Sequence, residues 1–179
     1  MEAAVRWSPG QTSDTSQYIL VDVAGNSISL NEAVIGSRSK ITTRTVARYD
    51  KVPSFTAFDW SKADTSLLAL GLSSGDASLI KIGSGQKSIS PLRIFPIRTQ
   101  RKCNSINFNS EGLLAVGLDR VRNDHCLTIY DVNEGKEAHS RLCTGEAVSS
   151  VRFFPGQPQE LVAAVARTSL RLFDLRGEI

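Results

Sequence analysis

The residues of this chain that could do chemistry are few, and they lack the companions that their chemistry needs. His125 stands beside Cys126, two residue types that bind zinc, but the further ligands of a zinc site are missing at suitable spacing. His125 and His139 both lie in polar sequence, and no set of nucleophile, base and orienting group can be read around them. We therefore expect no catalytic residue, no metal and no cofactor, and a protein that is not an enzyme.

A glycine-rich stretch, Gly83-Ser84-Gly85-Gln86-Lys87-Ser88, resembles a loop that binds phosphate. In a P-loop a glycine immediately precedes the lysine, because backbone amides there must reach the phosphate groups. Here Gln86 stands between the glycine and the lysine, and no helical pattern follows. The stretch predicts a turn between strands.

One charged loop remains as a candidate binding site. Asp119, Arg120, Arg122 and Asp124 carry charges of both signs between two apolar runs. Exposed ion pairs contribute little to stability, so a cluster of this kind suggests either internal salt bridges or a contact surface. We predict that these four residues bind a partner protein.

A basic strip lies upstream of that loop, at Arg93, Arg98, Arg101 and Lys102. Charges on an outer strand block association between sheets, and we expect these side chains to be solvated for that reason. The alternative is a strip that binds RNA or phospholipid. Aromatic residues that would stack on bases are not interleaved with the charges, so we expect no nucleic-acid partner.

The apolar runs around these candidates recur along the chain as groups of three short strands. One group occupies 103–108, 113–118 and 127–132. Similar groups occur at 58–61, 67–72 and 77–81, at 151–155, 161–166 and 170–174, and more weakly at 5–9, 18–22 and 28–30. A group of such short strands cannot bury both of its faces alone, so we expect neighbouring groups to cover them.

The repeat length indicates the class of fold. One aromatic in the first strand of each group recurs at intervals of about 45–53 residues: Trp7, Trp60, Phe108 and Phe153. Repeats of roughly 40–50 residues built from short strands are typical of propeller blades. Tyr130-Asp131 and Phe173-Asp174 are variants of the Trp-Asp dipeptide of WD40 repeats.

The predicted fold is therefore all-β. It is a partial WD40-type β-propeller of about 3.5–4 blades, each a four-stranded antiparallel meander, and part of a longer propeller. We expect one domain over 1–179, with units at about 1–50, 51–101, 102–145 and 146–179. Asp131 and Asp174 should accept hydrogen bonds that fix turns. The predicted structural core is Trp7, Trp60, Phe108, Tyr130, Asp131, Phe153, Phe173 and Asp174.

Composition supports an ordered domain and gives little indication of a partner. The chain has 179 residues, 41% of them hydrophobic and 22% charged, with a net charge of +3. These values are ordinary for a globular protein, and the small charge does not imply nucleic acid or an anionic membrane. Three scattered cysteines, Cys103, Cys126 and Cys143, predict free thiols in a reducing compartment. We expect a cytoplasmic location.

Three stretches resemble a known family. They are Cys103-Asn104 leading into Phe108-Asn109, the loop Gly117-Leu118-Asp119-Arg120-Val121-Arg122-Asn123-Asp124, and Leu172-Phe173-Asp174-Leu175-Arg176. In these the chain resembles the N-terminal propeller of the Mios (missing oocyte, Sea4-like) family, a subunit of the SEA/GATOR complexes. Family members are much longer, with an α-solenoid and a C-terminal cysteine/histidine zinc module that are not present in this sequence.

The resemblance implies a non-enzymatic scaffold for protein–protein interaction. Such a scaffold helps to relay amino-acid availability to the target-of-rapamycin kinase complex at the lysosomal or vacuolar surface. The implied partners are other WD40 and solenoid subunits of a SEA/GATOR-type complex, and membrane association would come only through them. Two alternatives stay open. One is a WD40 adaptor in an RNA-associated, trafficking or ubiquitin-related assembly, and the other is a propeller that binds phosphoinositides. An enzyme that uses the propeller channel is a further, weaker alternative.

Overall fold

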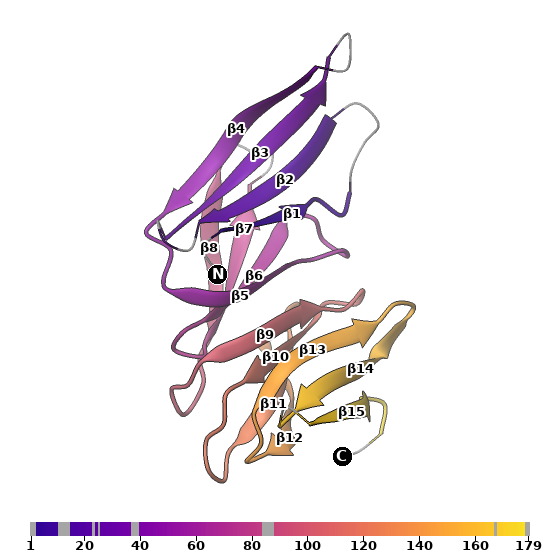
Figure 1. Ribbon diagram of the computed structural model, residues 1–179. Coiled ribbons are helices and arrows are strands. Elements are labelled where there is room, and N and C mark those ends of the chain that lie inside the picture. The colour runs from indigo at the N-terminus through magenta and orange to yellow at the C-terminus, as the bar shows by residue number, and fades with distance from the viewer. Residues whose placement is uncertain are drawn as a thin grey trace.

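A computed structural model describes residues 3–10, 15–22, 24, 26–36, 40–83, 88–166 and 168–177. In these residues the chain forms strands and turns and no helix, and the strands make up four antiparallel sheets (Figure 1). The all-β fold predicted from the repeat is therefore confirmed. No helix long and apolar enough to cross a membrane is found in the part of the chain that is described.

Each sheet is a meander in which consecutive strands are neighbours. The first sheet contains β1 (Ala3–Trp7), β2 (Thr15–Asp22), β3 (Ser27–Ile35) and β4 (Ile41–Asp50). The second contains β5 (Phe55–Trp60), β6 (Leu67–Leu72), β7 (Ala77–Ile82) and β8 (Ile89–Phe95). The third contains β9 (Cys103–Phe108), β10 (Leu113–Leu118), β11 (His125–Asp131) and β12 (Lys136–Thr144). The fourth contains β13 (Val148–Phe154), β14 (Gln157–Val165) and β15 (Ser169–Asp174).

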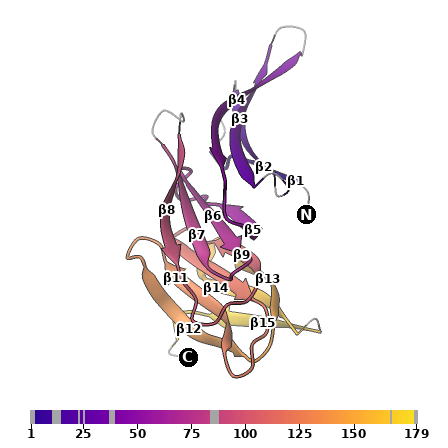
Figure 2. The ribbon, with the colours of Figure 1, turned by 90° about the vertical axis from the view of Figure 1, so that its left-hand side faces the viewer.

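The sheets follow one another through the molecule in chain order, with the first at the top of Figure 1 and the third and fourth at the bottom. In the turned view of Figure 2, β3 and β4 project together away from the other sheets. The core consists of three clusters, one at each junction between successive sheets. Each sheet therefore covers a face that its neighbour could not bury alone.

The second strands of the sheets show how one run of residues serves two clusters. In β6, Leu68 and Leu70 belong to the cluster shared with the first sheet, and Ala69 belongs to the cluster shared with the third. In β10, Leu114 packs toward the second sheet and Ala115 toward the fourth. Because successive side chains point to opposite faces, a strand covered on both sides is apolar throughout.

Two of these second strands, β6 and β10, have a glycine at the same position, next to their last residue. A Cβ atom on Gly71 would lie 2.2 Å from the Cys103 sulfur, and one on Gly117 would lie 2.7 Å from Cγ1 of Val148. Cys103 and Val148 begin the first strands of the next sheets, β9 and β13. The close packing between sheets therefore requires a residue without a side chain at both positions.

Four of the aromatic residues assigned to the core are buried. Trp60, Phe108, Tyr130 and Phe153 are 5%, 7%, 4% and 9% exposed. Phe173 is only partly buried and packs against the cluster between the third and fourth sheets.

The prediction that Trp7 lies in the core is wrong, because its side chain is 55% exposed. Trp60, Phe108 and Phe153 each contact the preceding sheet through the clusters between sheets. Trp7 pairs with Tyr18 beside it, edge to face, with ring centroids 5.2 Å apart. Among the described residues no sheet precedes the first one, so nothing covers this face.

The two aspartates assigned to the core lie in turns. Oδ1 of Asp131 accepts hydrogen bonds from the backbone N–H groups of Asn133 and Glu134, each at 2.9 Å. Oδ1 of Asp174 accepts one from the backbone N–H of Arg176 at 3.0 Å. Asp174 is exposed, which corrects its assignment to the core. A nearby guanidinium, that of Arg176, lowers the pKa of Asp174 to about 2.

Candidate functional site

The charged loop singled out in the sequence connects β10 to β11, and backbone hydrogen bonds fix its shape. The N–H of Asp119 donates to the carbonyl of Lys102 at 2.8 Å, and the N–H of Arg120 donates to Oδ1 of Asp119 at 2.9 Å. Asn123 has a φ of +60°, in the left-handed region that asparagine tolerates. The side chains of Asp119, Arg120 and Arg122 are exposed.

Asp124 differs from the other three loop residues, because an ion pair holds its side chain. Nη1 of Arg101 lies 2.5 Å from Oδ2 of Asp124, and Nη2 of Arg101 donates to the carbonyl of His125 at 2.6 Å. The Arg101 side chain is only 6% exposed, so the prediction that it is solvated is wrong. Burial alone would raise the pKa of Asp124, but the Arg101 guanidinium and the His125 N–H outweigh it and lower that pKa.

The structure thus gives the four predicted loop residues two different roles. Asp124 anchors the end of the loop to the segment that enters β9, since Arg101 lies just before that strand. Asp119, Arg120 and Arg122 remain at the surface of a loop whose two ends are fixed. A contact surface presented in this way loses little conformational entropy when it binds.

The basic strip is divided by the fold. Arg101 points inward, while Arg98 and Lys102 are exposed. Arg93 lies against the turn between β11 and β12, where a Cβ on Gly135 would fall 1.3 Å from its Nη1. Arg101 is therefore not part of an exposed cationic strip with the other three residues.

A small cavity lies beside the Arg101–Asp124 pair. Its volume is about 180 Å³, and Nε of Arg101 is a buried nitrogen that has no hydrogen-bond partner among the described residues. Nδ1 of His125 lies 2.9 Å from the hydroxyl of Thr144, and burial raises the pKa of Tyr130 to about 12. The lining residues are Pro96, Ile97, Arg98, Arg101, Asp124, His125, Thr128, Tyr130 and Glu137.

A row of polar side chains joins the first strands of neighbouring sheets, and sequence reasoning missed it. Oδ2 of Asp59 accepts hydrogen bonds from the backbone N–H of Phe108 at 2.9 Å and from Nδ2 of Asn107 at 2.8 Å. Oδ1 of Asn107 in turn accepts one from the backbone N–H of Phe153 at 2.8 Å. A signal was available in the sequence, because Asp59 and Asn107 directly precede Trp60 and Phe108, the recurring aromatic residues of their units.

The corresponding residues of the other two units are arginines. Arg6 precedes Trp7 and lies over the ring of Phe58, with Cζ 5.6 Å from the centroid. Arg152 precedes Phe153. Burial raises the pKa of Asp59 above its ordinary value even though the hydrogen bonds and the charges of Arg6 and Arg152 favour the carboxylate. These residues therefore form contacts between neighbouring sheets.

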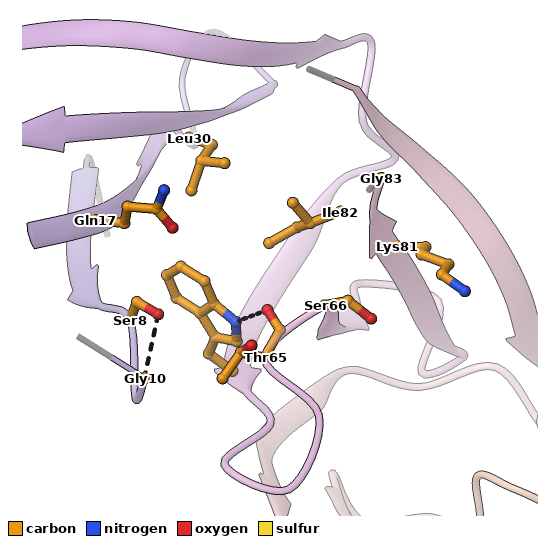
Figure 3. Close-up of a pocket in the computed structure, with 10 residues that line it drawn as sticks. Ser8, Gly10, Gln17, Leu30, Thr65, Ser66, Lys81, Ile82 and Gly83 are labelled. Atoms are coloured by element: carbon orange, nitrogen blue, oxygen red, sulfur yellow. Dashed lines mark hydrogen bonds between the residues drawn. The ribbon is translucent and has the colours of Figure 1, made fainter. Parts of the chain in front are cut away.

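A larger cavity of about 420 Å³ lies between the first and second sheets (Figure 3). Its apolar wall is formed by Leu30, Trp60 and Ile82, which are at most 5% exposed. The indole N–H of Trp60 donates to the carbonyl of Thr65 at 2.8 Å. The other lining residues are Ser8, Gly10, Gln17, Thr65, Ser66, Lys81 and Gly83. Cavities of this size are typical of ligand sites, and sequence reasoning missed this one.

The described residues contain no group of three or more histidine, cysteine, aspartate and glutamate side chains that could hold a metal ion. Cys103, Cys126 and Cys143 are free and buried. Burial raises the pKa of the Cys103 thiol to about 12. At neutral pH this thiol is protonated, so it packs as an apolar group.

Comparison with solved structures defines the class of protein. The chain is similar to a chain in the outer coat vertex of COPII on membranes, with a TM-score of 0.72 and 16% identity, over 97% of this chain and 47% of the other. It is also similar to Sqt1 from Saccharomyces cerevisiae, with a TM-score of 0.67 and 10% identity, over 89% and 45% of the two chains. The fold is that of a WD40-type β-propeller.

Within this class the chain is similar in sequence to two GATOR2 complex proteins and to a SEH-associated protein. It is 30% identical to the GATOR2 complex protein Mio of Drosophila melanogaster over 118 residues, 64% of this chain. It is 37% identical to SEH-associated protein 4 of Saccharomyces cerevisiae over 86 residues, and 42% identical to the GATOR2 complex protein MIOS of Dictyostelium discoideum over 74 residues. These matches cover 45% and 40% of the chain. The resemblance to the Mios family is thereby confirmed.

The matched regions make up 13%, 8% and 6% of the lengths of those three relatives. The chain therefore spans a small part of the proteins that it matches. No protein-family model matches it.

Proposed function

We propose that this chain is a non-enzymatic scaffold that holds protein subunits together in a SEA/GATOR-type complex. The observation that carries the proposal is the similarity to two proteins named as GATOR2 complex proteins and to one named as SEH-associated. The geometry supports it, because clusters of buried residues run through all three junctions between sheets and leave loops and edges free for contact. On this proposal the units at about 1–50, 51–101, 102–145 and 146–179 act as one partial propeller domain.

The proposed contact surface is the loop between β10 and β11, through Asp119, Arg120 and Arg122. These three side chains are exposed, while the Arg101–Asp124 ion pair holds the end of the loop in place. Charged loops of mixed sign favour recognition of a complementary surface and reject a partner with the wrong charges. Asp124 contributes to binding indirectly on this proposal, by fixing the conformation of the loop.

At the level of the cell, the complex would relay amino-acid availability to the target-of-rapamycin kinase complex. The chain would then work in the cytoplasm at the lysosomal or vacuolar surface, and it would reach the membrane through its partner subunits. The names of the relatives support the type of complex. The signalling role and the location rest on the resemblance to the family.

The test uses the protein expressed at its natural length in cells. An affinity tag allows the bound subunits to be measured for the parent protein and for the double variant Asp119→Ala/Arg122→Ala. The control is Lys62→Ala/Glu134→Ala, which removes one exposed charge of each sign from other turns. We expect the loop variant to lose a subunit that the control retains, at unchanged protein level and melting temperature.

The same cells test the signalling role. Phosphorylation of target-of-rapamycin substrates is followed while amino acids are withdrawn and restored. The loop variant should give a blunted response, and the control should respond like the parent. If the loop variant retains every subunit and a normal response, the loop is structural and the proposed contact surface is wrong.

A further inference from the structure

The cavity between the first and second sheets has a counterpart at the next junction, and comparing the two shows what is special about it. The second cavity, of about 230 Å³, lies between the second and third sheets. The strand registers relate the two places. Trp60 pairs with Leu68 as Phe108 pairs with Leu114, and Ile80 pairs with Leu68 as Tyr130 pairs with Leu114. Counting onward from these pairs, Gly83 occupies the position of Asn133.

The two cavities differ in the side chain at that position. The Asn133 side chain lies across the turn between β9 and β10, where its Nδ2 donates to the carbonyl of Glu111 at 3.4 Å. A Cβ on Gly112 would fall 2.5 Å from this Nδ2, which shows how closely the amide fills the space. Gly83 has no side chain to fill the same place, and the first cavity is about 420 Å³.

The wall of the first cavity is suited to an apolar group. Leu30 is fully buried, Ile82 is 5% exposed, and the indole N–H of Trp60 is already bonded to the carbonyl of Thr65. A polar group placed against this wall would therefore find no free donor there and would lose its hydration. About 150 Å³ is enough to hold benzene, so the cavity has room for a phenyl ring with a chain attached.

The charged side chain at the rim of the cavity indicates the charge of the group that would bind beside it. Lys81 is the one charged side chain among the described lining residues, and it is exposed. Figure 3 shows its ammonium group at the edge of the cavity, directed away from Leu30 and Gln17. Hydrogen bonds from Ser66 and, to a smaller extent, the charge of Lys81 lower the pKa of Asp64, but Lys81 and Asp64 form no ion pair. Two other polar side chains of the lining are engaged, since Gln17 donates to Glu32 and Ser66 donates to Asp64.

We propose that this cavity binds an extended acidic peptide segment of a partner protein, which inserts one large apolar side chain beside Trp60. The apolar site and the cationic group are separate, one inside the cavity and one outside it. A peptide supplies both, because residues one or two positions from the anchor lie roughly 3–7 Å further along an extended chain. The inference deepens the proposed scaffold function and rests on it for the kind of partner.

The test is direct binding to the purified protein at its natural length. The probes are the capped peptide Asp-Asp-Phe-Asp-Asp, its Asp-Asp-Ala-Asp-Asp analogue and the charge-swapped peptide Lys-Lys-Phe-Lys-Lys. Isothermal titration calorimetry measures the binding of each peptide to each protein. The phenylalanine peptide should bind at least tenfold more tightly than the alanine peptide, as burial of an aromatic side chain requires.

Two variants locate the site. Gly83→Asn gives the first cavity the residue that lines the second at this position. Its Cβ would fall 2.3 Å from the hydroxyl of Ser88, an exposed side chain that has to turn aside. It should weaken the acidic peptide at least tenfold, while the matched change Asn133→Gly leaves binding unaltered. Lys81→Glu should weaken the acidic peptide about two- to fivefold, as expected for an exposed ion pair, and should strengthen binding of the charge-swapped one.

The proposal is overturned if the phenylalanine and alanine peptides bind equally, or if Gly83→Asn binds like the parent. It is also overturned if toluene alone binds as tightly as the acidic peptide, since the occupant would then be a small apolar molecule. These outcomes are separate from those for the loop between β10 and β11. Peptide binding can fail while the loop variant still loses its subunit, and the reverse result is equally distinguishable.

Discussion

The carboxylate of Asp59 and the side-chain amide of Asn107 are hydrogen-bonded at 2.8 Å, across the boundary between the second and third sheets. Asn107 repeats the arrangement one junction further on, where its Oδ1 accepts from the backbone N–H of Phe153. Each side chain thus occupies a backbone donor of the next sheet. The register between sheets is set by directional polar contacts as well as by the apolar clusters.

This arrangement predicts a specific dependence of stability on pH. Burial raises the pKa of Asp59 above its ordinary 3.8, so the folded state binds this proton more tightly than the unfolded state does. The contribution of this proton to the free energy of unfolding is complete below pH 3.8. It is lost as the pH rises through the pKa that Asp59 has in the folded state. Asp59→Asn does not titrate and keeps an acceptor for the N–H of Phe108.

The unfolding free energy of the parent minus that of Asp59→Asn should therefore fall as the pH rises from 4 toward neutrality. Urea unfolding of both proteins at a series of pH values measures this difference, and other titrating groups cancel in it. A difference that is flat, or that grows with pH, would show that burial does not dominate at Asp59.

Breaking the Arg101–Asp124 pair should be costly. Asp124→Ala leaves a guanidinium that is 6% exposed without its carboxylate. Removal of one partner from a buried pair costs about 3–5 kcal/mol, and partial exposure of Asp124 reduces the expected loss to about 2–3 kcal/mol. Arg48→Ala, which breaks an exposed pair with Asp50, should cost less than about 1 kcal/mol. Equal losses in denaturant titrations would argue that Arg101 is solvated after all.

The two tryptophans should respond very differently to truncation. Trp60→Ala removes a side chain that is 5% exposed and should cost about 3–5 kcal/mol, as should Phe108→Ala. Trp7→Ala removes one that is 55% exposed and should cost less than half as much. Thermal melts of the three variants provide the comparison. If Trp7→Ala were as damaging as Trp60→Ala, something would have to cover the outer face of the first sheet.

Two glycines with positive φ separate backbone strain from crowding. Gly75 has a φ of +98°, and a Cβ there would lie 2.3 Å from the carbonyl oxygen of Arg101. Gly145 has a φ of +69° and nothing within 4 Å. Gly145→Ala should cost about 1 kcal/mol from strain alone, and Gly75→Ala should cost at least twice that, because the backbone must also move. Similar losses for the two variants in urea unfolding would mean that the contact at Gly75 relaxes freely.

Much of the fold could be predicted from the sequence, because the repeat combines short strands with a regular spacing of aromatic residues. The runs at 67–72 and 113–118 are strands β6 and β10, buried on both faces as their apolar sequence indicated. Trp7 shows the limit of such reasoning. Its spacing identified its place in the unit correctly, but burial depends on whether a neighbouring sheet is present.

The candidate sites were harder to predict, since they depend on contacts between units. Arg101 and Asp124 are 23 residues apart in sequence, and neither carries a local pattern that announces the other. Gly83 lines the larger cavity at the position that Asn133 occupies in the smaller one, and sequence reasoning assigned Gly83 only to a turn. Asp59 and Asn107 do share a position, directly before the recurring aromatic residue of their units. That pattern could have been used to predict the contacts between their sheets.

The hydrogen bonds that pass from Asp59 to Phe108 and from Asn107 to Phe153 have a mechanical consequence. At the corresponding place in the first unit Arg6 rests on the ring of Phe58, a contact that can slide without breaking a directional bond. The last three sheets are thus joined by directional bonds, while the first is joined to the second by the buried cluster and the Arg6–Phe58 contact. Under a pulling force we expect this junction, where the unfilled space beside Trp60 lies, to yield first.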